Sequence, residues 1–166
     1  MISDELVKLA FSFVNLARQC GLKVATAESC TGGLLSGALT EIPGSSEIFE
    51  CGFITYSNEA KTNMLGVDPN LLSHYGAVSQ EVAIAMAEGA LAHSRANISV
   101  AITGIAGPTG ATLSKPIGLV HFAVAKVGQN TLPEVVHFED IGRNRVREAA
   151  VKKAISLLIE RINQNK

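Results

Sequence analysis

The sequence predicts an α/β protein with a mixed, mostly parallel five-stranded sheet, an antiparallel fourth strand, and helices on both faces. Strand-length apolar runs alternate with helical repeats through the first part of the chain, which is typical of parallel strands joined by right-handed crossovers. Residues 98–103 form an apolar run, as expected for a strand buried on both faces. A Gly/Pro-rich loop without a helix pattern separates this run from the next one. A parallel connection usually needs a helix, so we expect the fourth strand to be antiparallel to the third.

Local signals define the individual elements. The first helix is capped by Ser3 or Asp4, carries one apolar stripe, and ends before Gly21. The remaining expectations, in chain order, are strand 22–27, helix 34–40, strand 49–56, a helix capped by Ser57 or Asn58, a connection over 66–75, a helix capped by Ser79, and then strands 98–103, 117–126 and 134–138, and helix 144–162. We expect residues 1–166 to form one domain, because two would be unusual at this length.

Composition excludes several classes of protein. The hydrophobic fraction of 47% is ordinary for a core that needs no disulfide or metal, and the net charge of −1 argues against a nucleic-acid binder with a basic surface. No apolar run approaches ~18 residues, so we expect no membrane span. The acidic start of the chain and three cysteines without CxxC spacing predict a reduced, cytoplasmic protein without a signal peptide. The four histidines form no HxxxH or HExxH pair, so we expect no metal site.

Three glycine- or serine-rich segments each follow a predicted parallel strand. They cover residues 28–33, 56–61 and 103–108. Ligands of open α/β sheets bind beyond the carboxyl ends of such strands. The three segments are therefore expected to meet at one edge of the sheet and to form the functional site.

Ser29 is the first candidate nucleophile. It lies where a strand turns into a helix, and the backbone N–H groups of a helix N-terminus can bind a phosphate or an oxyanion. The alternative is that Ser29 or Thr31 only caps the helix, which is the commoner role for such residues. Cys30 is a rival nucleophile, but neither of the other two segments contains a histidine to activate it.

Lys61 is the candidate base. A lysine desolvated in a cleft, or placed near an arginine, has a lowered pKa, and a serine–lysine pair oriented by Tyr56 needs no histidine. The alternative is a solvated lysine and an amphipathic tyrosine at the sheet edge. Gly104 and Gly107 would allow close approach of a ligand to the third segment, or would only permit a sharp chain reversal. Three arginines that open the last helix could bind a phosphate or form a solvated helix face: Arg143, Arg145 and Arg147.

Five ordered motifs resemble the CinA C-terminal domain family, the bacterial nicotinamide-nucleotide amidohydrolases, over nearly the whole chain. The motifs are TAESCTGG at 26–33, PGSS at 43–46, YSNEAK at 56–61, GAVS at 76–79 and TGIAGP at 103–108. The resemblance implies a three-layer α/β/α sandwich that hydrolyses nicotinamide mononucleotide to nicotinic acid mononucleotide and ammonia without a cofactor. It implies the catalytic residues Ser29, Lys61 and Tyr56, and the substrate-binding residues Thr31, Gly32, Gly33, Ser46, Thr103, Gly104, Ala106, Gly107 and Arg143.

Two alternatives remain open at the level of sequence. A non-catalytic nucleotide-binding module would keep the same pocket, since some relatives with this domain are inactive as deamidases. A small-residue face over residues 82–90 would allow close packing of a helix against a second subunit, and hence a homodimer or larger oligomer. The same face could instead pack on the chain's own sheet.

Overall fold

A computed structural model describes residues 2–164 and contains the expected five-stranded sheet, with strand order β2-β1-β3-β4-β5. The strands are β1 (Val24–Glu28), β2 (Phe49–Ile54), β3 (Ile98–Gly104), β4 (Leu119–Lys126) and β5 (Leu132–His137). β1 pairs in parallel with both β2 and β3, whereas β4 is antiparallel to β3 and to β5. The predicted fold class and the antiparallel fourth strand are therefore confirmed.

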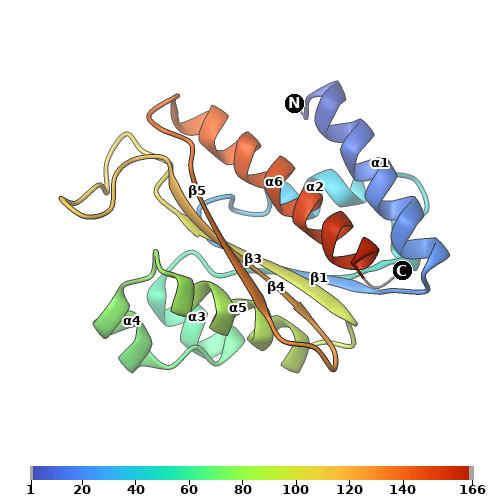
Figure 1. Ribbon diagram of the computed structural model, residues 1–166, viewed down its shortest axis with the longest axis horizontal. Helices are drawn as coiled ribbons and strands as arrows, with labels where there is room; N and C mark the ends of the chain where they lie inside the picture. The colour runs from blue at the N-terminus through green and yellow to red at the C-terminus, as the bar shows by residue number, and fades with distance from the viewer. Residues whose placement is uncertain (1, 165–166) are drawn as a thin grey trace.

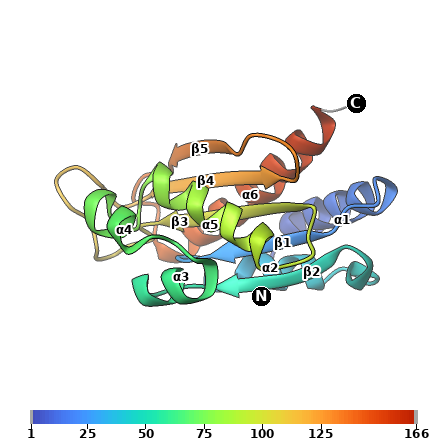
Figure 2. The ribbon, with the colours of Figure 1, turned by 90° about the horizontal axis from the view of Figure 1, so that it is seen from below.

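Helices cover both faces of the sheet (Figures 1 and 2). One layer contains α1 (Asp4–Gln19), α2 (Leu34–Thr40) and α6 (Arg143–Asn163), and the other contains α3 (Asn58–Leu65), α4 (Pro69–Tyr75) and α5 (Gln80–Ala92). A short 3-10 helix, η1 (Ser45–Glu47), precedes β2. The caps expected at Ser3, Ser57 and Ser79 are present, because each side chain accepts a backbone N–H of the first helical turn.

The two faces of the sheet bury different side chains. On β3, Val100 and Ile102 belong to the larger core beneath α1, α2 and α6. Ala101, between them, faces the alanine-rich core beneath α5. This alternation follows from the two-residue period of a strand and explains why β3 is apolar on both sides. The sheet is thus closed off on both faces, and functional groups must gather at its edges.

The small-residue face of α5 packs inside the chain. Its buried residues belong to the alanine-rich core, and a Cβ added at Gly89 would lie 2.1 Å from the backbone oxygen of Leu65. Glycine at this position therefore allows α5 to approach the end of α3 closely. This face is buried within the chain and is not available to a second subunit. The small-residue face therefore no longer supports the expectation of an oligomer.

The expected connection over residues 66–75 is wrong in part, because it contains α4. Asp68 accepts the N–H of Asn70, and Pro69 opens the helix at a position where its missing N–H costs nothing. The Asp-Pro pair within the expected connection is thus the start of a helix.

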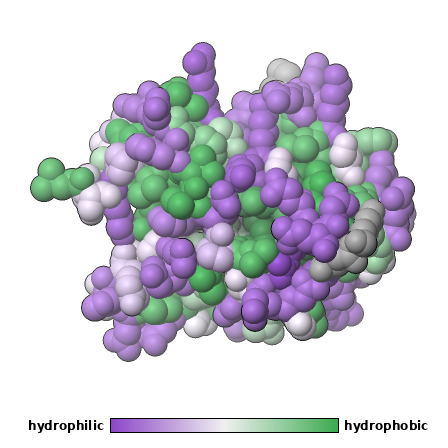
Figure 3. All heavy atoms as spheres, viewed as in Figure 1, coloured by the Kyte–Doolittle hydropathy of each residue, from purple (hydrophilic) through white to green (hydrophobic). Residues whose placement is uncertain are grey.

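The surface is mixed in character. Polar and apolar side chains are interspersed over the face in Figure 3. The loop between β3 and β4 projects from the sheet in Figure 1, and Leu113 on this loop is fully exposed. Within residues 2–164, no helix has both the length and the hydropathy required to cross a bilayer.

Candidate active site

The predicted meeting of three segments at one sheet edge is what the structure shows. β1, β2 and β3 end side by side, since Glu28 pairs with both Ile54 and Ile102. The segments beyond them surround a cavity of about 260 Å³. Its lining residues are Ser29, Cys30, Tyr56, Lys61, Ala77, Val78, Thr103, Gly104, Ile105, Ala106, Gly107, Thr109, Gly110 and Arg143.

Ser29 and Lys61 are in direct contact in this cavity. Lys61 Nζ lies 3.0 Å from Ser29 Oγ. The same nitrogen donates to the backbone oxygens of Thr55 at 2.8 Å and of Tyr56 at 3.4 Å. With two hydrogens directed to these carbonyls, a neutral amine would present its lone pair to the hydroxyl of Ser29. The geometry is therefore that of a serine whose proton can pass to a lysine.

Burial prepares Lys61 for this role. Only 1% of the residue is exposed, although it stands on the first turn of α3. Removal from water disfavours the ammonium form and lowers the pKa of Lys61 from 10.5 to about 8. The alternative of a solvated surface lysine is thus excluded. Burial, rather than a neighbouring arginine, accounts for the lowered pKa.

Glu28 holds the turn that carries Ser29, a role that the sequence motif did not reveal. The buried carboxylate accepts the N–H groups of Leu35 at 2.9 Å and of Ser36 at 3.0 Å, and the Ser36 hydroxyl at 2.7 Å. The N-cap of α2 is Gly33, which has no side chain to accept an N–H of the first turn, so Glu28 supplies the missing acceptor. A glycine N-cap with an acidic residue five positions earlier is the only sequence signal for this arrangement.

The turn after Ser29 contains Cys30, which lines the cavity, and Thr31, Gly32 and Gly33, which do not. Burial raises the pKa of the Cys30 thiol to about 11, which leaves it protonated and unsuited to be the nucleophile. Thr31 is buried, and its hydroxyl has no hydrogen-bond partner within the described part of the chain. Thr31, Gly32 and Gly33 shape the turn but are not among the lining residues of the cavity. The Gly32 N–H donates to the backbone oxygen of Ser29.

Tyr56 and Arg143 form a second pair at the cavity. The Tyr56 hydroxyl accepts from Arg143 at 3.1 Å, and Arg143 also donates to the backbone oxygen of Gly107 at 2.8 Å. Lys61 reaches Ser29 without passing through Tyr56, whose backbone oxygen rather than its hydroxyl contacts the amine. The Tyr56 hydroxyl thus contacts Arg143, and Lys61 contacts Ser29 directly.

The end of β3 and the loop after it form part of the cavity wall. Thr103 donates to the backbone oxygen of Ala77 at 2.8 Å, which ties this wall to the segment before α5. A Cβ on Gly104 would lie 2.7 Å from Val120 Cγ2, and Gly107 has a φ of +81° that side chains disfavour. Ala106 completes the predicted loop. Sequence reasoning did not assign Thr109 and Gly110, which also line the cavity.

The three arginines at the start of α6 have separate surroundings. Arg143 lines the cavity, Arg145 lines a different surface hollow, and Arg147 donates to backbone oxygens of the Ser29 turn.

The prediction for Ser46 is wrong. This exposed residue belongs to η1, which precedes β2, whereas the cavity lies beyond the carboxyl end of that strand.

Comparisons with known proteins identify the family of this chain. Residues 6–162 match the family model described as the CinA C-terminal domain. A CinA-like protein of Akkermansia muciniphila is 48% identical over 146 residues, which are 88% of this chain and 35% of that protein. The chain thus spans about a third of the length of the curated relatives that it matches.

Two crystal structures resemble the whole chain. The competence/damage inducible protein CihA from Agrobacterium tumefaciens superposes with a TM-score of 0.95 at 48% identity and covers 98% of each chain. The competence-damaged protein (CinA) superfamily protein from Escherichia coli superposes with a TM-score of 0.89 at 35% identity, over 96% of this chain and 92% of that one.

Proposed function

We propose that this chain, which belongs to the CinA C-terminal domain family, hydrolyses the carboxamide of nicotinamide mononucleotide to give nicotinic acid mononucleotide and ammonia. The observation that carries the proposal is the 3.0 Å contact between Ser29 Oγ and the buried Nζ of Lys61. A serine beside a base of lowered pKa is the arrangement that acyl transfer from an amide requires. The choice of nicotinamide mononucleotide as the substrate rests on the motifs that resemble those of the family's amidohydrolases.

In the acylation step, neutral Lys61 takes the hydroxyl proton of Ser29 while Oγ attacks the carboxamide carbon. Backbone N–H groups of the turn that follows Ser29 stabilise the oxyanion of the tetrahedral intermediate, and such a donor is typically worth 10²–10³-fold in rate. The intermediate then collapses. Lys61 returns the proton to the amide nitrogen, ammonia leaves, and a nicotinoyl ester remains on Ser29.

In the deacylation step, water attacks the ester carbon. Lys61 accepts a proton from this water and returns it to Ser29 Oγ as the ester bond breaks. Nicotinic acid mononucleotide is released as the carboxylate. The cycle uses the same lysine as base and acid twice, and every atom of the products comes from the substrate and one water molecule.

Arg143 is the residue that we assign to the substrate phosphate. Its guanidinium is permanently charged, lines the cavity, and is held by Tyr56 and the backbone oxygen of Gly107. A purely nucleotide-binding module would need Arg143 and the glycine loop. Nucleotide binding alone does not require a lysine that is desolvated in contact with a serine. The buried pair of Ser29 and Lys61 therefore favours the amidohydrolase over the binding module.

The test is ammonia release from three amides that differ in recognition: nicotinamide mononucleotide, the riboside that lacks its phosphate, and free nicotinamide. We expect kcat/KM to be largest for the mononucleotide and to fall at least about tenfold without the phosphate, the cost of one charge-assisted contact. Absence of ammonia from all three amides would refute the proposal and leave the binding module as the explanation.

A further inference from the structure

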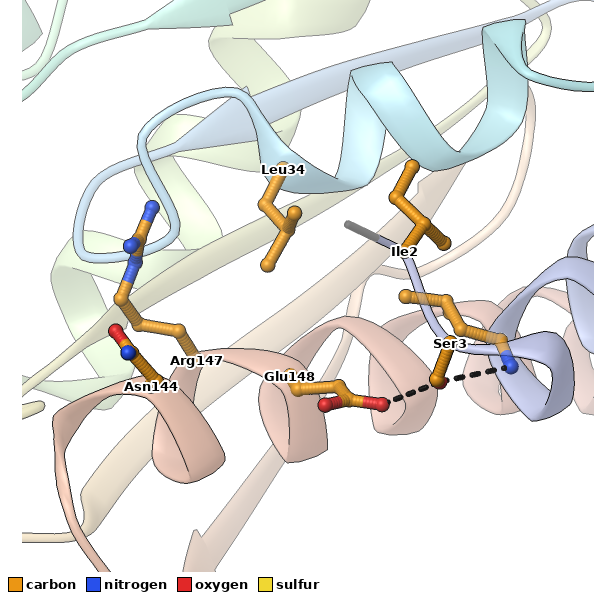
Figure 4. A pocket seen from close by; sticks show the side chains of 7 residues that line it. Ile2, Ser3, Leu34, Asn144, Arg147 and Glu148 are labelled. Atoms are coloured by element: carbon orange, nitrogen blue, oxygen red, sulfur yellow. Dashed lines mark hydrogen bonds between the residues drawn. The ribbon is translucent and has the colours of Figure 1, made fainter.

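Arg147 reaches the Ser29 turn from α6 and lines a cavity other than the substrate cavity. Its Nε donates to the backbone oxygen of Cys30 at 3.1 Å, and its Nη2 donates to that of Thr31 at 3.0 Å. Figure 4 shows Arg147 extending from α6 toward the loop that precedes α2. It lines a separate cavity of about 290 Å³ together with Ile2, Ser3, Leu6, Leu34, Asn144 and Glu148. Glu148 in turn accepts the hydroxyl of Ser3 at the start of α1.

The turn needs an external support. Gly32 and Gly33 follow one another with φ values of +57° and +96°, and consecutive glycines leave the backbone many accessible conformations. The Thr31 hydroxyl has no hydrogen-bond partner within the described residues, so it does not anchor the turn. Glu28 holds the first turn of α2 beyond the glycines, whereas Arg147 holds the two peptide groups before them.

Because a peptide group is planar, the contact between Arg147 and the Cys30 oxygen also sets the direction of the Thr31 N–H. In a trans peptide the C=O and N–H groups point to opposite sides. With the Cys30 oxygen held by Arg147, the N–H of Thr31 must face away from the guanidinium. The Thr31 oxygen is held in the same way, and the Gly32 N–H on the far side of that peptide donates to the Ser29 oxygen. The Thr31 oxygen also accepts the N–H of Leu34 at 3.1 Å, so backbone bonds help to hold the Thr31–Gly32 peptide. Arg147 thereby sets the plane of the Cys30–Thr31 peptide and reinforces the plane of the next one.

We propose that Arg147 is a positioning residue of the active site, which holds the Cys30 and Thr31 carbonyls so that the Thr31 N–H faces the oxyanion formed during attack by Ser29. The role rests on the proposed amide hydrolysis. Among the described residues, Arg147 makes no hydrogen bond to Ser29 or Lys61, and it does not line the substrate cavity. Its loss should therefore lower kcat and leave KM almost unchanged, because the oxyanion exists only after substrate has bound.

The first arm of the test is kinetic. Arg147→Met keeps an apolar stem of similar length but has no donors, and we expect its kcat for nicotinamide mononucleotide to fall about 100-fold, with KM within threefold of the original. Arg147→Lys should recover part of the loss, because one ammonium can hold one carbonyl but cannot span both as the planar guanidinium does. Retained kcat with a raised KM would overturn the proposal and make Arg147 a substrate-binding residue.

The second arm is independent of catalysis and uses amide hydrogen exchange of the peptide that covers residues 29–33. We expect faster exchange in Arg147→Met than in the unaltered chain. Unchanged exchange overturns the proposal whatever the kinetics show. This arm also separates the two claims: if the unaltered chain releases no ammonia, the proposed hydrolysis fails, and the exchange still decides whether Arg147 holds the turn.

Arg161→Met is the matched control. Arg161 lies at the other end of α6 and also donates to a backbone oxygen, that of Asn130, at 2.6 Å. The Arg161→Met variant loses an arginine–carbonyl contact of the same helix at a site far from Ser29. We therefore expect this variant to have a lower melting temperature and to retain its kcat. An equal loss of kcat in both variants would show that α6 stability, rather than the Ser29 turn, is responsible, and would overturn the proposal.

Discussion

Substitution of Lys61 by arginine distinguishes two roles of this residue: a general base that accepts a proton, and a positive charge that only neutralises the substrate phosphate. Lys61→Arg keeps a positive charge in the cavity, but a guanidinium does not lose its proton in proteins. If Lys61 accepts the proton of Ser29, the variant should lose at least about 10³-fold in kcat, within the range found when a general base is removed. If Lys61 only attracts the substrate phosphate, kcat should survive and KM should change.

The magnitude of the effect of burial follows from the lowered pKa. With a pKa of about 8, roughly one molecule in eleven has a neutral Lys61 at pH 7. With the ordinary value of 10.5, only about one molecule in 3,000 would be neutral. Burial therefore increases the active fraction about 300-fold, equivalent to about 3.4 kcal/mol.

The assay is steady-state ammonia release between pH 6 and pH 10, with kcat and KM measured separately. For the unaltered chain, kcat/KM should rise about tenfold per pH unit and reach a plateau above a midpoint near 8, since the neutral amine is the active form. The rise should be absent in Lys61→Arg. A midpoint near 10, or an arginine variant with most of its kcat, would refute the assignment of Lys61 as the base.

Three further results are expected. Ser29→Ala should release no ammonia while it still binds substrate and keeps its melting temperature, whereas Cys30→Ala should remain active because the pKa of the thiol is raised to about 11; the reverse pattern would move the nucleophile to the cysteine. Arg143→Ala should raise KM for nicotinamide mononucleotide about tenfold and leave KM for the riboside unchanged, and equal effects on both substrates would argue against phosphate contact. Gly89→Ala should cost about 2 kcal/mol or more in a denaturant titration, because the added Cβ would lie 2.1 Å from the backbone oxygen of Leu65; a neutral result would mean that α5 shifts freely.

The fold was largely predictable because its signals are local. Capping serines, the apolar run of β3 and the missing crossover before β4 determined the order and direction of the elements. α4 escaped prediction because it is one short helix that opens with Asp68 and Pro69, a pair that also starts turns. Seven residues contain too few repeats for a helical period to stand out.

The site was predictable where strand order alone brings residues together. Ser29, Lys61 and Thr103 follow or flank neighbouring strand ends, so topology placed them at one edge. Ser46 was wrongly included because it came from the resemblance alone, although it precedes β2 and so lies at the amino end of a strand whose carboxyl end faces the cavity. The functions of Arg143 and Arg147 could not be separated from sequence, because residues four apart on a helix share a face and only the packed neighbours distinguish them.

The most direct test of the central claim is a single-turnover reaction with the chain in excess over nicotinamide mononucleotide, run in parallel with Ser29→Ala. Mass spectrometry of the nucleotide and an enzymatic ammonia assay follow both products. The account predicts equimolar ammonia and nicotinic acid mononucleotide from the unaltered chain, and intact substrate with the variant. Recovery of intact nicotinamide mononucleotide from the unaltered chain, or equal turnover by Ser29→Ala, would contradict it.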